Sequence, residues 1–197
     1  MLSVLKLRTV VNLAVLSLAA GAVAGEPGPS APRDPFRVAG YVPVGFRGFG
    51  TWTARKETPL YVSPDSRRLA ATITRCEEVT AQDGELRGRP WEMRVLKAHP
   101  PFRKGETFWV LARDLEEGYF QLWYRGQVRD DVAGELADAP PFGQTHCSKA
   151  SARCWLRVDK EPRQVHWVHV RKRDGTSGWS DRASDFGEGP AKENQCP

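Results

Sequence analysis

Short runs of aromatic and β-branched residues, each bounded by Gly, Pro or Asp, recur along most of this chain. They occupy residues 58–62, 78–80, 91–95, 106–111, 119–124, 154–158 and 165–170. Such residues favour strands, and the residues between the runs favour turns. No window beyond residue 24 keeps the apolar period of about 3.6 residues that marks an amphipathic helix. The pattern predicts an all-β fold, a small barrel or a sandwich, with short helical turns near 64–69 and 181–186.

Two segments have the pattern of hairpins with a tight basic turn. The first covers residues 118–128 and the second covers residues 166–179. In the second, Asp174-Gly175 provides the turn chemistry that favours a hairpin, and Gly178 allows a close backbone approach before Trp179. We expect each segment to form a strand, a turn and a return strand.

The N-terminus has the features of a secretory signal. Lys6 and Arg8 precede an apolar run at 10–20, and the small residues Ala-Val-Ala follow at 22–24. This order predicts a signal peptide over residues 1–24, the alternative being a buried helix. The run is shorter than the roughly 20 residues that a membrane helix needs, so we expect no stable membrane anchor. Cleavage lowers the formal net charge from +5 to +3, which does not favour a nucleic-acid partner.

The cysteines all lie after the proposed cleavage point. They are Cys76, Cys147, Cys154 and Cys196. An even number in an exported chain predicts two disulfides, and three pairings are open. Cys147 and Cys154 enclose a short loop that closes easily, which would leave Cys76 for Cys196. Their spacing differs from that of structural zinc sites, so we expect no metal.

The second hairpin resembles a known family. Residues 167–179, WVHVRKRDGTSGW, are similar to the W-x-x-V, D-G, G-W hairpin of bacterial SH3-like (SH3b) domains. Residues 58–61 with Pro64 resemble that family's first strand and loop, and residues 104–111 resemble its second strand. The resemblance implies an SH3-like small β-barrel, which the disulfides expected from the cysteine count would stabilise. Because residues 130–151 do not fit a minimal unit, one elaborated barrel and two incomplete barrels are both open.

The resemblance also suggests how the chain is divided. We expect a flexible Pro/Gly-rich leader over residues 25–48 and a first SH3-like unit over residues 49–132. A second SH3-like segment, with a disulfide loop and a C-terminal tail, is expected over residues 133–197.

The chain shows no catalytic motif. His166 and His169 are an odd number of residues apart on an expected strand, so they point to opposite faces and cannot readily share a metal or a substrate. The segment at 175–178 is one residue short of a G-x-S-x-G elbow, and no Gly-rich phosphate loop is present. We therefore predict a non-enzymatic protein with no catalytic residue, no cofactor and no metal.

The tryptophans provide the candidate binding surface. Strand alternation places Trp123 outward with Arg125, and Trp167 outward with His169. Aromatic and Arg side chains are enriched in binding surfaces, and the alternative for each tryptophan is core packing. The predicted ligand-binding residues are Trp123, Trp167, His169, Arg125 and Arg171.

Together these features predict a periplasmic or secreted binding protein of the cell envelope. The SH3b resemblance implies a cell-wall peptide or peptidoglycan-derived ligand. A different possibility is an accessory or inhibitor protein that binds another envelope protein. A third is a hydrolase whose site the motifs do not reveal. The sequence leaves the ligand and the oligomeric state open.

Overall fold

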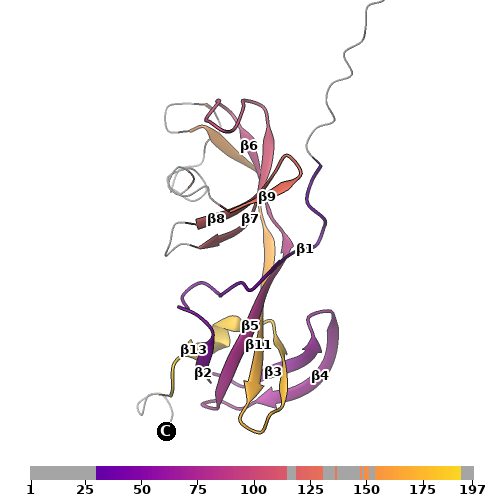
Figure 1. Ribbon diagram of the computed structural model, residues 1–197, viewed down its shortest axis with the longest axis vertical. Coiled ribbons are helices and arrows are strands. Elements are labelled where there is room, and N and C mark those ends of the chain that lie inside the picture. Colours follow the sequence, from indigo (N-terminus) through magenta and orange to yellow (C-terminus); the bar gives the residue numbers. More distant parts are fainter. Residues whose placement is uncertain are drawn as a thin grey trace, which may run out of the picture.

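The computed structural model describes residues 30–114, 119–130, 136, 147, 149–150 and 154–191. Within these residues the chain forms thirteen strands and one short 3-10 helix, and the strands make two antiparallel sheets (Figure 1). The predicted all-β class is confirmed, but no closed barrel forms in this part of the chain. No helix of the described segments is long and apolar enough to cross a membrane.

The first sheet has eight strands in the order β13-β2-β5-β11-β12-β3-β4, and β1 also pairs with β5. The strands are β1 (Phe36–Ala39), β2 (Gly50–Ala54), β3 (Thr58–Ser63), β4 (Ser66–Ile73), β5 (Glu78–Arg89), β11 (Arg163–Lys172), β12 (Ser177–Ser180) and β13 (Phe186–Glu188). The core of this sheet is built on Trp52, Leu60 and Val168, all with 0% exposure.

The second sheet has five strands in the order β10-β6-β7-β8-β9. They are β6 (Trp91–Val95), β7 (Thr107–Asp114), β8 (Tyr119–Tyr124), β9 (Gln127–Arg129) and β10 (Leu156–Lys160). One face of this sheet is packed by large apolar side chains such as Met93, Phe108 and Leu122. The two sheets thus have separate hydrophobic cores.

The long pair β5–β11 connects the two sheets. Its register runs from Arg163 opposite Arg89 to Lys172 opposite Val79. All strands of the five-stranded sheet lie between β5 and β11 in sequence, so this sheet is an insertion between two central strands of the other (Figure 1). The boundary expected at residues 132/133 lies between β9 and β10, within this inserted sheet.

Side chains from both sheets meet where the insertion begins. Phe36 and Leu86 from the eight-stranded sheet pack against Leu111 and Ala112 of β7. Leu111 lies at an irregularity in the β7–β8 register, and its carbonyl accepts a hydrogen bond of 2.7 Å from Gln164 Nε2. Bulged residues leave backbone groups without a ladder partner, so Gln164 both satisfies this carbonyl and ties the sheets together.

Both predicted hairpins are confirmed. β11 pairs with β12 around Asp174-Gly175, where Gly175 has φ of 90°. β8 pairs with β9 around Arg125-Gly126, whose φ angles of 53° and 79° are both positive. Tight turns with positive φ match the right-handed twist of paired strands.

Of three local expectations, one is met and two differ from the structure. The helical turn near 181–186 forms as η1 (Ala183–Asp185), but the one expected near 64–69 is wrong because β4 begins at Ser66. Strand β1 lies within residues 25–48, the region expected to be a flexible leader. It is held in place because Phe36 is buried between the sheets.

Cys147 and Cys154 form the expected disulfide. Cys76 is also disulfide-bonded, and its expected partner Cys196 lies outside the described residues.

Candidate functional site

One row of side chains crosses all five strands of the smaller sheet on its outer face. Strand register places Lys160 opposite Glu92, Glu92 opposite Trp109, Trp109 opposite Trp123, and Trp123 opposite Val128. Directly opposed residues of antiparallel strands lie on the same face of a sheet. We call this row the Trp109–Trp123 face.

The alternation of each strand explains why this row points away from the core. Met93, Phe108 and Leu122 are sequence neighbours of members of the row and have 0% exposure in the core of the sheet. Successive residues of a strand point to opposite faces. The two tryptophans therefore lie on the side of the sheet opposite to its own core.

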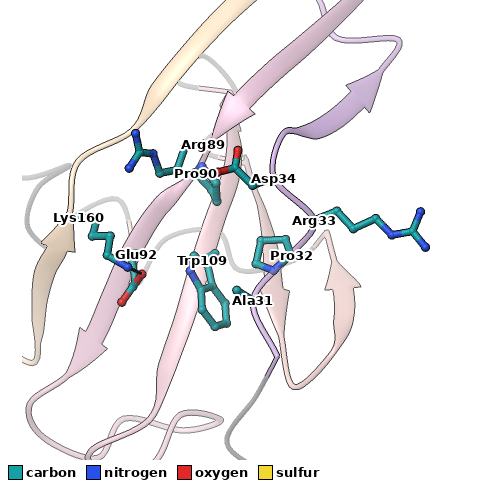
Figure 2. A pocket seen from close by; sticks show the side chains of 9 residues that line it. All are labelled: Ala31, Pro32, Arg33, Asp34, Arg89, Pro90, Glu92, Trp109 and Lys160. Atoms are coloured by element: carbon teal, nitrogen blue, oxygen red, sulfur yellow. Dashed lines mark hydrogen bonds and ion pairs between the residues drawn. The ribbon is translucent and has the colours of Figure 1, made fainter.

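An N-terminal segment lies over this face, and we call residues 30–34 the N-terminal arm. The indole Nε1 of Trp123 donates a hydrogen bond of 2.7 Å to the backbone carbonyl of Ser30. Ala31 and Pro32 lie beside the ring of Trp109 (Figure 2). With the arm in place, Trp109 has 8% exposure although it lies on the outer face.

The arm forms one wall of a small pocket of about 200 Å³. Glu92 and Lys160 line the side of the pocket across from Pro32, and the ring of Trp109 lies between them (Figure 2). The side chain of Arg33 points away from this pocket (Figure 2). The arm therefore presents Pro32 to the tryptophan, while the Arg33 side chain extends outward and Asp34 lies at the pocket.

A second hollow, of about 510 Å³, lies next to the first and shares Glu92 and Trp109 with it. Its other lining residues come from β6, from the turn before β7 and from the start of β7. They are Arg94, Lys104, Gly105, Glu106 and Thr107. No residue of the N-terminal arm lines this hollow. Trp109 thus stands between one hollow that the arm lines and one that it leaves open.

Ion pairs lie on the β6–β10 side of Trp109. Lys160 Nζ lies 2.7 Å from Glu92 Oε2, and Arg94 Nε lies 3.0 Å from Asp159 Oδ2. Burial raises the pKa of Asp159, but hydrogen bonds from Arg157 and Arg94 outweigh it and lower the pKa overall. This rim remains charged at neutral pH and offers both signs of charge to a polar ligand.

Glu106, which lines the second hollow, is paired with the buried Tyr124. The Tyr124 hydroxyl donates a hydrogen bond of 2.5 Å to Glu106 Oε2. Burial and this hydrogen bond raise the pKa of Tyr124 to about 12. Arg125, one of the predicted site residues, lies 2.7 Å from Glu106 Oε1 and over the Tyr124 ring. The Arg125 guanidinium therefore interacts with both members of this pair.

The remaining predicted site residues lie on the other sheet. Trp167 and His169 are on β11, and Arg171 is exposed near the end of that strand. His169 packs against Trp179 with ring centroids 5.0 Å apart. Burial lowers the pKa of His169, although the charge of Asp83 partly opposes this. The structure therefore divides the five predicted residues between the two sheets.

The expectation that Trp167 is partly exposed is wrong, because its exposure is 5%. Arg67 of β4 lies over the Trp167 ring, and Tyr61 of β3 meets the ring edge-on. The turn between these two strands is held by Asp65, which accepts hydrogen bonds from Arg87 of β5 and Arg37 of β1. Alternation gave the correct face of the strand, but the β3–β4 hairpin folds across that face.

Sequence reasoning did not single out Trp109 or the N-terminal arm. The alternation of Phe108 and Val110 with Thr107 and Trp109 was available in the sequence, and it places Trp109 outward. No local pattern predicts where a Pro-rich segment will lie on a distant strand. No family model, curated protein or solved structure matches this chain.

Proposed function

We propose that this chain is an exported, non-enzymatic binding protein of the cell envelope that holds an extended peptide on the Trp109–Trp123 face. One observation carries the proposal: a segment of the chain already lies on this face, with its Ser30 carbonyl bonded to Trp123 Nε1. A surface that accepts one extended segment has the shape and the donor needed for another.

The chemistry of the face suits a peptide. Two aromatic side chains on neighbouring strands provide an apolar area, and tryptophan contributes strongly to binding energy when a partner covers it. The indole N–H of Trp123 is a donor for a backbone carbonyl, and Glu92 and Lys160 provide a charged rim. Val128, next to Trp123 in the row, remains 50% exposed and extends the apolar area.

Export and an SH3-like relationship belong to the same proposal. The Cys147–Cys154 disulfide supports export, because disulfides persist mainly in oxidising compartments. The SH3-like relationship is supported by the β11–β12 hairpin, which forms where the family-like pattern at residues 167–179 lies. Of the ligands that this relationship implies, a peptide fits the site better than a glycan, because the arm on the face is itself a peptide.

Nuclear magnetic resonance of the seven indole N–H groups tests the proposal. The full mature chain is titrated to millimolar concentration with a synthetic peptide of residues 25–35 that carries a nitroxide spin label, and separately with purified peptidoglycan muropeptides that carry the same label. We expect the labelled peptide to broaden the signals of Trp109 and Trp123 while those of Trp167 and Trp179 stay sharp. The proposal fails if the labelled peptide broadens none of these signals, or broadens only those of Trp167 and Trp179.

A further inference from the structure

We infer that the N-terminal arm is an internal copy of the ligand, so that the peptide bound by this protein contains proline and must displace the arm. The inference rests on the proposed function and deepens it in two ways. It names the chemical class of the ligand, and it makes the arm a competitor for the site.

The position of Pro32 supports the ligand class. Proline has no backbone N–H, so it lies against the Trp109 ring without burying an unpaired donor. Its fixed φ also reduces the conformational entropy lost when an extended segment is held in place. The Ser30 carbonyl, two residues earlier, supplies the acceptor that Trp123 Nε1 needs. Aromatic surfaces elsewhere recognise proline-rich segments in the same way.

The attachment of the arm supports competition. Residue 34 is followed closely by Phe36, which has 5% exposure and packs with Leu86 and Leu111. Strand β1 then pairs with β5 from Phe36 to Ala39. A segment tethered this closely to its binding surface has an effective concentration in the millimolar range. A free peptide must therefore compete with a segment that is always present.

The open hollow beside Trp109 offers contacts with which a ligand can displace the arm. Arg94, Lys104 and Glu106 line this hollow of about 510 Å³, and no arm residue lies along it. A longer peptide that occupies the arm position and continues into this hollow makes contacts that the arm does not make. Only such additional contacts favour the peptide over the arm, because contacts that both of them make contribute equally to the two bound states.

Calorimetric titration with two peptides tests the inference. One peptide has the sequence of residues 25–35, and the other replaces the prolines at 27, 29 and 32 with glycine. Each is titrated into the mature wild-type chain and into Pro32→Asp, which brings a carboxylate towards Trp109 and Glu92 and should release the arm. Val44→Asp is the matched control, because Val44 is 50% exposed and lines neither hollow.

We expect the proline peptide to bind Pro32→Asp about tenfold or more tightly than it binds wild type or Val44→Asp, since the apparent Kd rises as the open fraction falls. The glycine peptide should bind all three chains more weakly. Equal affinity of wild type and Pro32→Asp would overturn the competition and leave the proposed function standing. Equal affinity for both peptides would overturn the ligand class, and no binding by any chain would overturn the proposed function as well.

A second variant tests the competition independently of whether Pro32→Asp folds. A flexible Gly-Ser insertion between Asp34 and Pro35 keeps every residue of the arm and of the face. It lowers the effective concentration of the arm. We expect the insertion to tighten binding of the proline peptide relative to wild type. Unchanged binding in a folded insertion variant would contradict the competition.

Discussion

Trp123 and Ser30 are 93 residues apart in sequence, yet the indole Nε1 of one donates a hydrogen bond of 2.7 Å to the carbonyl of the other. This bond holds the N-terminal arm against the outer face of the five-stranded sheet, where Trp109 is the direct cross-strand neighbour of Trp123. Each of the two tryptophans therefore meets the arm, one through a hydrogen bond and the other through contact with Pro32.

The first prediction concerns this hydrogen bond. Trp123→Phe keeps an aromatic ring but removes the donor, and a neutral hydrogen bond contributes about 0.5–1.5 kcal/mol. The arm should open more often, so that trypsin cleaves after Arg33 several-fold faster. Mass spectrometry of fragments that begin at Asp34 measures the rate. Trp179→Phe, on the other sheet, is the control, and an unchanged rate in Trp123→Phe would show that the bond does not hold the arm.

The second prediction concerns Trp167. Because only 5% of this residue is exposed, under Tyr61 and Arg67, Trp167→Ala should lower the free energy of unfolding by about 3–5 kcal/mol. Chemical denaturation measures the loss. A change below about 0.5 kcal/mol, typical of an ordinary surface site, would mean that the β3–β4 hairpin does not cover the ring.

The third prediction concerns acid. Desolvation raises the pKa of Asp65, but hydrogen bonds and charges from Arg87 and Arg37 outweigh it, so the pKa in the folded state is lowered. A lowered carboxyl pKa stabilises the fold above the unfolded value of about 3.9, and this contribution is lost as pH falls through the folded value. The difference in Tm between wild type and Asp65→Asn should therefore be largest near neutral pH and shrink below about pH 3.9. A difference that stays constant from pH 7 to pH 2 would contradict the role of Asp65.

Local chemistry in the sequence was sufficient to predict the all-β class and the two hairpins, but not β4, where a helical turn was expected. Asp174-Gly175 sets the β11–β12 turn within a few residues, and the Asp174 side chain also accepts a hydrogen bond from the Thr176 N–H. Such turns depend on neighbouring residues alone, so no knowledge of distant contacts was needed.

The sheet topology could not be predicted in this way. The pairing of β5 with β11 joins Val79 to Lys172 across the whole inserted sheet. Alternation gives the two faces of a strand but not its partner, and the pairing of distant strands depends on packing throughout the fold.

The site was only partly predictable for the same reason. Trp123 was identified correctly as lying on the outer face, because its alternation with Leu122 and Tyr124 is local. Trp167 was assigned outward by the same rule, but the hairpin that carries Arg67 covers it. The arm was missed because its contact with Trp123 joins residues 93 positions apart in the sequence.

Affinity for the residue 25–35 peptide in the Pro32→Asp background tests the central claim most directly, since the arm no longer competes there. Trp123→Ala is added to this background and compared with Trp179→Ala, and thermal unfolding confirms that both chains are folded. Truncating a central aromatic costs about 2 kcal/mol or more of binding, which corresponds to a roughly 30-fold weaker Kd. We predict this loss for Trp123→Ala and a change of less than about twofold for Trp179→Ala. An unchanged Kd in a folded Trp123→Ala chain would contradict the claim that the Trp109–Trp123 face binds the peptide.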